Sequence, residues 1–377
     1  MGRACRKARI MRRLPRCIVI SCVAVLAACA SKRPVAFVDN PFPLLLWLGE
    51  FTRPAGTAYP GIPAELQFGS LSGLAPDAGR GHWIGVIDDR DRTRVAWLDV
   101  TVGDKGLDVK PTRVQTLRAG AGVPDRLVTR SDLEAVVALA NGSFVMAEEG
   151  HRADGEVWQP VLLQVSRDGV VTNVIEYPPA FRLTAGNPTG VRDNQGIESL
   201  AVTPGGRLIA GLEQPLIEDG AVTFERGGAG RLIEFVPSGS TFKPGRQWCY
   251  MISPTPRLEG FDEICNDGEN GLVELLAFSE TTLVSMERAC LITADRQFVA
   301  NAVQLFSVEL AAGWARKRLL LDFQTIIPRL SPALSRLENF EALTFGPIVN
   351  GMKTLLIASD DNFRASQKTS FLLFGMK

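Results

Sequence analysis

Histidine is almost absent from this sequence, and its scarcity excludes most imidazole-based sites. Only His82 and His151 occur among the 377 residues, and neither belongs to an HExxH motif. Zinc and iron sites usually draw several ligands from histidine or cysteine, and there is no CxxC pair either. GxSxG is also missing, so the sequence offers no recognisable nucleophile arrangement for covalent catalysis.

Cysteine is scarce beyond residue 29, where only Cys249, Cys265 and Cys290 remain. The N-terminal segment described below predicts export, and an oxidising compartment outside the cytoplasm permits a disulfide. Cys249 with Cys265 is the preferred pair, because it closes a short loop rich in turn residues. In the alternative interpretation all three are small buried side chains.

The apolar run near the N-terminus, Cys17–Ala28, is about a dozen residues long, whereas a membrane-spanning helix needs about 20. It follows a basic stretch that contains no acidic residue, and small residues mark its end. This layout is typical of a secretory signal. We therefore predict a signal peptide over residues 1–28.

The end of that segment resembles the lipobox of bacterial lipoproteins, with Leu26, Ala27, Ala28 and Cys29 in order. The resemblance implies cleavage before Cys29 and lipidation of its thiol, with residues 29–45 as a proline-bearing tether. Ser31 is not an aspartate, which in lipoproteins favours the outer membrane. We therefore expect a lipid-anchored protein at the periplasmic face of the cell envelope; a plain signal peptide with an incidental cysteine is the alternative.

An excess of positive charge is also missing from the part that would remain after cleavage. Residues 1–28 hold seven of the 41 basic residues and none of the 41 acidic ones, which leaves 34 bases against 41 acids, or a net charge of about −7. Nucleic-acid binding needs clustered Lys and Arg. We therefore predict no nucleic-acid partner. The acidic net charge is better suited to binding cations.

Helical periodicity is weak throughout residues 46–377, which we predict to form one all-β domain. Short runs rich in Val, Ile, Leu, Phe and Trp alternate with Gly, Pro, Asp and Asn about every ten residues. The 36 glycines and 23 prolines are spread evenly. Neither a second domain nor a low-complexity segment is indicated.

Five segments of this domain share one pattern: an opening position, an apolar run, a turn, a second apolar run and one or two acids. They cover residues 72–89, 132–149, 196–213, 271–287 and 339–361. The paired apolar runs are nearly unbroken, whereas apolar and polar residues alternate along the strands between the segments. This difference indicates buried inner strands and more solvent-exposed outer strands. The repeat predicts a β-propeller with five blades, and the longest interval leaves room for a sixth.

The acids of each segment fall at both ends of a predicted hairpin, so they should meet at one end of the blade. Because inner strands surround the channel of a propeller, all five ends should converge on an acidic mouth. The predicted ring contains Glu134, Glu149, Glu198, Glu213, Glu274, Glu287, Glu341, Asp360, Asp88 and Asp89.

Such a ring needs compensation, because clustered carboxylates raise one another's pKa. Several hard oxygen ligands in a flexible arrangement favour Ca²⁺ over Mg²⁺, so calcium is the predicted cofactor. Arg288 and Arg90 are candidates to neutralise the ring or to hold an anionic ligand in catalysis. In the alternative interpretation each glutamate fastens its blade to the next one through backbone hydrogen bonds.

From about residue 71 to the C-terminus the sequence resembles a bacterial propeller family described as having the esterase-like activity of phytase. The matching pieces are SGL, DDR, AEEG, NQGIESLA, GLEQPL, GLVELL, MERA, NFEALTFGP and SDDNF. Two positions depart from the family pattern: Glu148 stands where aspartate is more usual, and Ser72 stands where a glutamate opens the other repeats. The resemblance implies a propeller and hydrolysis of phosphate or other esters.

Two functions therefore stay open at this stage. One is a calcium-dependent hydrolase of small anionic esters, in which ring-bound ions and an arginine face the substrate. The other is a non-catalytic envelope lipoprotein whose rim binds a ligand or a partner protein. Few basic residues flank the ring, which disfavours phytate more than it disfavours hydrolysis in general. The oligomeric state is not indicated.

Overall fold

Strands dominate the protein because short β-branched and aromatic runs alternate with tight turns. A computed structural model describes residues 44–77, 81–153, 155–184, 186 and 189–377. The predicted signal peptide, Cys29 and residues 30–43 of the predicted tether lie outside these residues. No helix in the described ranges is both long and apolar enough to cross a membrane.

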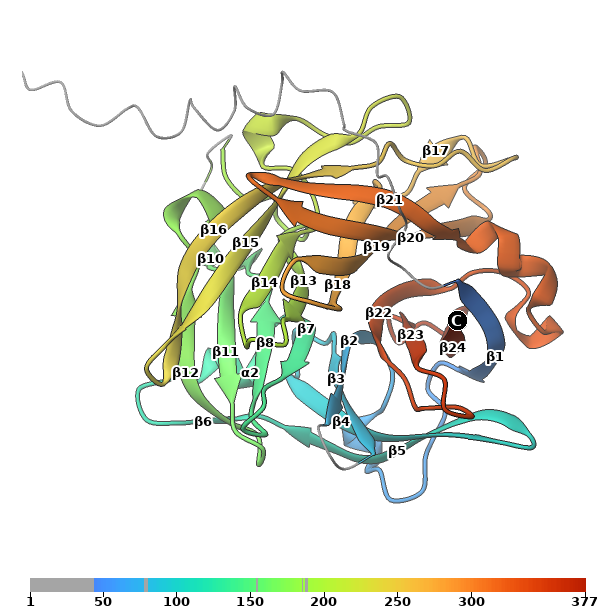
Figure 1. Ribbon diagram of the computed structural model, residues 1–377, viewed down its shortest axis with the longest axis horizontal. Coiled ribbons are helices and arrows are strands. Elements are labelled where there is room, and N and C mark those ends of the chain that lie inside the picture. The colour runs from blue at the N-terminus through green and yellow to red at the C-terminus, as the bar shows by residue number, and fades with distance from the viewer. Residues whose placement is uncertain (1–43, 78–80, 154, 185, 187–188) are drawn as a thin grey trace, which may run out of the picture. The chain divides into compact units, whose positions relative to one another are not determined.

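Five four-stranded blades form a β-propeller in the described part of the chain (Figure 1). In order from the innermost strand outward, blade 1 contains β2 (Leu71–Asp77), β3 (His82–Ile87), β4 (Arg94–Gly103) and β5 (Gly106–Thr116); blade 2 contains β7 (Leu133–Ala138), β8 (Phe144–Glu148), β11 (Val161–Val165) and β12 (Val170–Glu176); blade 3 contains β13 (Ile197–Val202), β14 (Leu208–Leu212), β15 (Gly228–Ser238) and β16 (Thr241–Ile252); blade 4 contains β18 (Gly271–Ala277), β19 (Thr282–Ile292), β20 (Val299–Ala311) and β21 (Trp314–Asp322); blade 5 contains β22 (Asn339–Phe345), β23 (Thr354–Asp360), β24 (Lys368–Met376) and β1 (Leu45–Pro54). The predicted propeller is confirmed, with one blade for each of the five sequence repeats.

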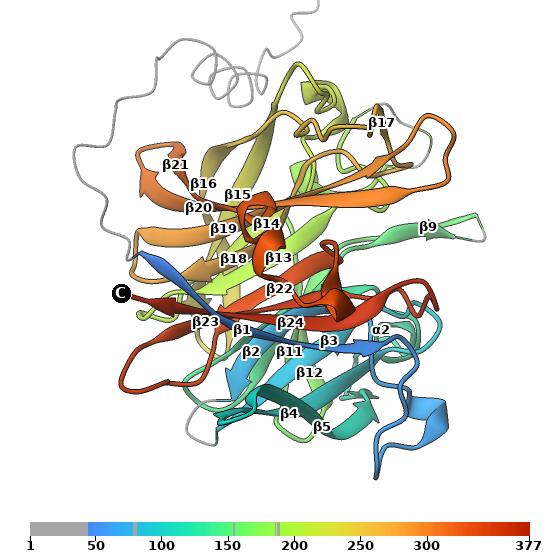
Figure 2. The ribbon, with the colours of Figure 1, turned by 90° about the vertical axis from the view of Figure 1, so that its right-hand side faces the viewer.

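Several shorter elements lie outside the four-stranded blades. They are β6 (Arg118–Ala119), the hairpin β9 (His151–Ala153) and β10 (Glu156–Trp158), β17 (Glu263–Ile264), the helix α2 (Arg126–Thr129), and 3-10 turns at Ala64–Leu66, Pro179–Phe181, Ile217–Asp219, Phe323–Arg329 and Pro332–Leu334. In Figure 2, β9 and β17 project on the same side of the propeller.

The ring of blades is closed by the two ends of the domain. β1 pairs antiparallel with β24, from Leu45 opposite Met376 to Pro54 opposite Lys368. Residue 46, where the sequence analysis began the domain, is the second residue of this strand. Blades 3 and 4 are also joined at their outer edges, where β16 and β21 pair in parallel over two residues.

The core lies in the seams between blades. Five apolar clusters each combine side chains of two neighbouring blades, such as Leu200 of blade 3 with Ala135 of blade 2. Successive inner strands contact one another around the channel in the order β2, β7, β13, β18, β22 and β2 again. This packing buries both faces of the inner strands, as their unbroken apolar runs predict.

The same β-bulge occurs near the start of every innermost strand. Each inner strand skips one residue in its pairing with the next strand of its blade. The skipped residues are Ser72, Glu134, Glu198, Val273 and Glu341. A bulge re-aims a side chain that would otherwise follow the pleat, so these five positions decide what faces the mouth of the channel.

Gly73 tests how closely the inner strands pack. A Cβ atom there would lie 2.8 Å from the Cα of Ala135 and 2.9 Å from the carbonyl oxygen of Glu134. We predict that Gly73→Ala lowers the free energy of unfolding by ~1–3 kcal/mol through overpacking, measured by thermal and urea denaturation. Gly103→Ala is the control, because nothing lies within 4 Å of its Cβ position. Equal effects of the two substitutions would contradict the tight seam.

Candidate metal centre and active site

Each blade presents two side chains to one end of the channel. The first comes from the bulge of the innermost strand, and the second comes from the end of the following strand, where its backbone meets the residue two before the bulge. From blade 1 to blade 5 the pairs are Ser72 and Asp88, Glu134 and Glu149, Glu198 and Glu213, Val273 and Arg288, and Glu341 and Asp360. Blade 4 is therefore the only blade in the described structure that brings a base and no acid.

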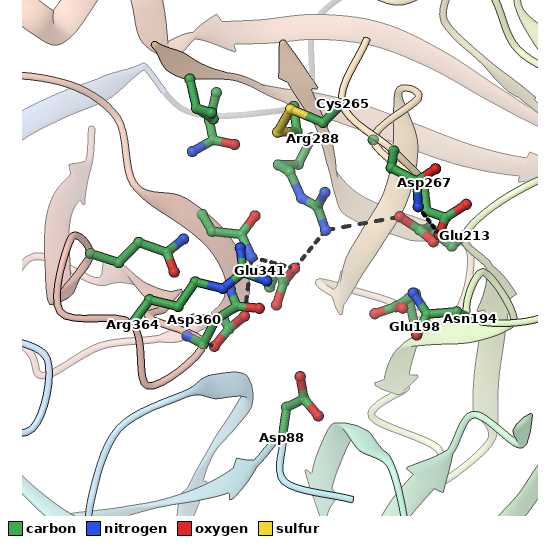
Figure 3. Close-up of a pocket in the computed structure, with 18 of the residues that line it drawn as sticks. Asp88, Asn194, Glu198, Glu213, Cys265, Asp267, Arg288, Glu341, Asp360 and Arg364 are labelled. Carbon is green, nitrogen blue, oxygen red and sulfur yellow. Dashed lines mark hydrogen bonds and ion pairs between the residues drawn. A yellow bond between two sulfur atoms is a disulfide. The ribbon is translucent and has the colours of Figure 1, made fainter. Parts of the chain in front are cut away.

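These side chains surround a cavity of about 810 Å³ at the mouth of the channel (Figure 3). Seven of the predicted ring acids line it, namely Asp88, Glu134, Glu149, Glu198, Glu213, Glu341 and Asp360, together with both candidate arginines, Arg90 and Arg288. The rim is built by β17, the extended ends of β19 and β20, and the turn after β23. The opposite end of the channel is lined mainly by apolar residues of the same inner strands.

The acids of blades 1 to 3 form two overlapping clusters. Ligand oxygens of Asp88, Asp132 and Glu134 lie within 4.8 Å of one another, and so do those of Glu134, Glu149 and Glu198. Burial raises the pKa of Asp88, Glu134, Glu149 and Glu198 well above the usual range, and repulsion between the neighbouring carboxylates raises it further. Full ionisation of the cluster would therefore place more negative charge there than its surroundings neutralise.

Arg90 compensates part of this charge in blades 1 and 2. Its guanidinium donates to Asp132 and to the side-chain oxygen of Asn194, and it lies 3.6 Å from Glu149. Asp132 itself is fully buried, and its Oδ1 has no hydrogen-bond partner among the described residues.

Arg288 compensates the acids on the other side. It donates to Glu341 at 2.6 Å and lies 3.9 Å from Glu213. The pKa of Glu213 is raised to about 8 by burial, against which the charge of Arg288 acts. Burial also raises the pKa of Asp360 to about 7, although Ser70, Asn339 and the backbone of Asn362 donate to its carboxylate at 2.5, 3.1 and 2.7 Å.

Contacts between neighbouring blades hold several ring acids in place. Glu149 accepts a hydrogen bond from the backbone N–H of Gly196 in the next blade at 2.7 Å. A Cβ on Gly271 would lie 2.5 Å from Cγ of Glu213. Glycine two residues before a bulge therefore makes room for a long glutamate of the preceding blade.

A family model described as esterase-like activity of phytase matches residues 66–363. The chain belongs to this phytase-like family. No match was found among curated proteins. Among solved structures, the chain is similar to a protein of the GH130 family, with 9% identity and a TM-score of 0.46, covering 90% of this chain and 95% of that chain. That family of mannoside phosphorylases contains glycoside hydrolases that target β-1,2 mannosidic linkages in Candida mannan. An endo-arabinase from Bacteroides thetaiotaomicron is similar with 11% identity and a TM-score of 0.46, covering 90% of this chain and 98% of that chain. Neither similarity bears on the substrate.

The structure corrects the predicted ring in the fourth repeat of this phytase-like chain. Glu274 and Glu287 each lie one residue away from the ring positions, which Val273 and Arg288 occupy. The missed signal is the interval between the two ring positions of one repeat. Glu134 to Glu149, Glu198 to Glu213 and Val273 to Arg288 each span 15 residues, whereas Glu274 to Glu287 spans 13. A slip of one residue turns a side chain to the other face of a strand.

Both displaced glutamates are structural. Glu274 accepts hydrogen bonds from the backbone N–H groups of Leu200 and Leu275 at 3.2 and 2.9 Å, which fastens blade 4 to blade 3. Glu287 is fully buried and accepts from Tyr250 at 2.7 Å, from Asn270 at 2.8 Å and from Lys317. Glu274 and Glu287 therefore match the alternative interpretation, in which a glutamate fastens its blade to a neighbouring one.

Asp89 also lies outside the cavity lining, because its carboxylate forms an ion pair with the buried Arg94. Conversely, Asp132 belongs to the acidic cluster but is missing from the predicted ring. Its position at the opening of the second repeat, directly before β7, is the sequence signal that could have identified it.

The disulfide prediction was wrong in its partner. Cys265 is bonded to Cys290, and Cys249 is a buried cysteine on the outer strand β16 that takes no part in this disulfide. The reason is the pairing of β17 with β19, which sets the backbone N–H of Cys265 against the carbonyl of Cys290. The disulfide ties this part of the rim to blade 4.

The donor set of the cavity fits a hard cation. All candidate ligands are carboxylate oxygens, as Ca²⁺ prefers. The buried Oδ1 of Asp132 has no hydrogen-bond partner in the described structure although Oδ2 pairs with Arg90, so Oδ1 is an open ligand position in the cluster. Within the described residues neither Glu134 nor Glu198 accepts a hydrogen bond, so their oxygens are available as ligands.

We predict that the chelated protein loses stability as pH rises. An unfolded glutamate titrates near 4.5, whereas folded Glu213 titrates near about 8. Between these values the native state holds protons that the unfolded chain does not, so the free energy of unfolding falls with rising pH. Melting temperatures in chelator should decline between about pH 4.5 and about pH 8, the window set by these two values. A flat profile would contradict the crowded, uncompensated cluster.

Proposed function

We propose that this phytase-like protein is a calcium-dependent hydrolase of phosphomonoesters or related esters that acts in the cell envelope. The observation that carries the proposal is the group formed by Glu134, Glu149 and Glu198, whose ligand atoms lie within 4.8 Å of one another beside a large open cavity. Family membership supports ester hydrolysis. The predicted signal peptide and lipobox support the location.

Glu134 and Glu198 would hold the cation, with Glu149 and the Asp88 and Asp132 pair beside them. Glu149 is pre-positioned, because its Oε1 accepts from the N–H of Gly196 and its Oε2 lies 3.6 Å from Arg90. A calcium ion bound there would supply a Lewis acid that neutralises charge developing on an ester oxygen.

Of the two candidate arginines, Arg288 is better placed to face a substrate. Arg90 is occupied by Asp132 and Asn194. Arg288 pairs with Glu341 through one terminal nitrogen, while its Nε is buried with no hydrogen-bond partner in the described structure. That nitrogen can donate to an oxygen that becomes negative in the transition state.

Asp360 is the candidate for proton transfer. Its carboxylate lines the cavity, and its pKa of about 7 is suited to accepting a proton near neutral pH. Three hydrogen bonds fix its orientation, so it can take a proton at a defined place in the cavity.

Substitution of one carboxylate tests the cation site. Glu198→Gln should abolish most of the rise in melting temperature that calcium gives the unsubstituted protein, because it removes a charged ligand. Glu274→Gln is the matched control: it is the neighbouring repeat's buried glutamate, but its hydrogen bonds can be kept by an amide oxygen. The cation site would be misplaced if both variants kept the full calcium shift.

Turnover tests the activity itself. The purified protein should hydrolyse at least one member of a panel of phosphomonoesters and simple carboxylic esters when calcium is present, and a chelator should reduce that rate at least tenfold. Circular dichroism should show that the chelated protein is still folded at the assay temperature. Absence of turnover from folded, calcium-loaded protein on every substrate would overturn the hydrolase and favour the ligand-binding lipoprotein.

A further inference from the structure

The cavity is divided into two chemically different sides. Blades 1 to 3 supply the carboxylate cluster. The wall formed by blades 4 and 5 contains Glu341 and Asp360, but it also carries the donor side chains Arg288, Arg364, Asn301 and Gln367. Figure 3 shows Arg364 pointing toward Glu341 and Asp360 on one side of the cavity, with Glu198 and Glu213 on the other side. A ligand in this cavity would meet a cation-binding side and a hydrogen-bond-donating side.

The turn that presents Arg364 is held in an unusual backbone conformation. Asn362 and Phe363 have φ values of 47° and 49°, a region that a bulky residue such as phenylalanine rarely enters. Asp361 stabilises the turn, because its carboxylate accepts from Thr369 and from the N–H groups of Ser70 and Phe363 at 3.1 and 3.0 Å. Such conformations persist where the surrounding structure enforces them, and they concentrate at functional sites.

The SDDNF segment therefore has a structural purpose that its sequence does not reveal. Phe363 packs against the apolar cluster between blades 5 and 1, and the centroid of its ring lies 5.1 Å from the guanidinium carbon of Arg94. The N–H of Arg364 donates to the carbonyl of Asp361 at 2.8 Å. Anchored in this way, the turn directs the side chain of Arg364 over the mouth instead of away from the propeller.

Arg364 has no structural partner that explains its position. Its guanidinium forms no hydrogen bond or ion pair with any described residue, although it lines the cavity. Asp360 already accepts three hydrogen bonds, and Glu341 already pairs with Arg288 at 2.6 Å. Two further groups of this wall are unsatisfied within the described structure, namely the buried Nε of Arg288 and the buried Oε1 of Gln367.

We propose that Arg364, with the Nε of Arg288, forms an oxyanion subsite that binds the negatively charged group of the substrate. A guanidinium offers paired donors that match the oxygens of a phosphate or a carboxylate. The subsite lies across the cavity from the cation cluster, so an anionic ester can reach both at once. Arg364 is then a substrate-binding residue and sets the preference for anionic over neutral esters. This inference rests on the proposed function for its substrate, but the subsite can be tested separately.

Binding of inorganic phosphate to the full chain tests the subsite without any turnover. Isothermal titration should show that Arg364→Gln weakens phosphate binding at least tenfold, in calcium-loaded and in chelated protein alike. Arg329→Gln is the control, since Arg329 is also an exposed arginine but does not line the cavity. The phosphate affinity of this variant should stay within twofold of the unsubstituted protein. Calcium affinity should be the same in all three proteins.

The outcomes separate the two proposals. Unchanged phosphate affinity in Arg364→Gln, or no phosphate binding by the unsubstituted protein, would overturn the subsite even if calcium binds. Failure to bind calcium, with phosphate binding still dependent on Arg364, would overturn the proposed cofactor and keep the subsite. Acetate added as a competitor shows which anions the subsite accepts. Displacement of phosphate by acetate indicates a general oxyanion site, and no displacement indicates a preference for phosphate. Either result supports the subsite.

Discussion

Repulsion among carboxylates at one end of the channel is the constraint on which the rest of the site depends. The repeated bulge brings a side chain of every inner strand to the same end, and in three of the five blades of the described structure that side chain is a glutamate. The resulting cluster has strongly raised pKa values because burial disfavours charge and like charges repel. Proton uptake relieves this repulsion, and so would the cation of the proposed function.

The asymmetry of the ring converts a cation site into a candidate active site. If every blade supplied two acids, the mouth would be uniformly negative and would repel an anionic ester. Blade 4 instead supplies Val273 and Arg288, and blade 5 adds Arg364 through the turn after Asp360. The negative and positive sides face each other across one cavity, which is the geometry that a bound ion and an anionic substrate both require.

Much of the architecture could be predicted from the sequence because the repeats carry it. Unbroken apolar runs in pairs identify inner strands, and their recurrence identifies blades. The register within a repeat was less accessible: both faces of an inner strand are buried, so the apolar pattern is the same whether Val273 or Glu274 faces the mouth. The apolar pattern therefore does not decide between them, and only the 15-residue interval shared with the second and third repeats favours Val273.

Tertiary contacts explain the other differences between prediction and structure. The disulfide depends on the pairing of β17 with β19, which joins segments about 25 residues apart and has no local signal. The role of Arg364 depends on a turn in which Asn362 and Phe363 adopt positive φ values, a conformation that propensity would not assign to phenylalanine. Asp132 joins the cluster through Arg90 of the preceding blade.

A crystal structure of the protein soaked with calcium would test the central claim most directly. The account predicts anomalous density between Glu134 and Glu198, with carboxylate oxygens of both residues at about 2.3–2.6 Å from the ion. Density for water alone at that place, with Glu134 and Glu198 hydrogen-bonded to each other as protonated acids at saturating calcium, would contradict it.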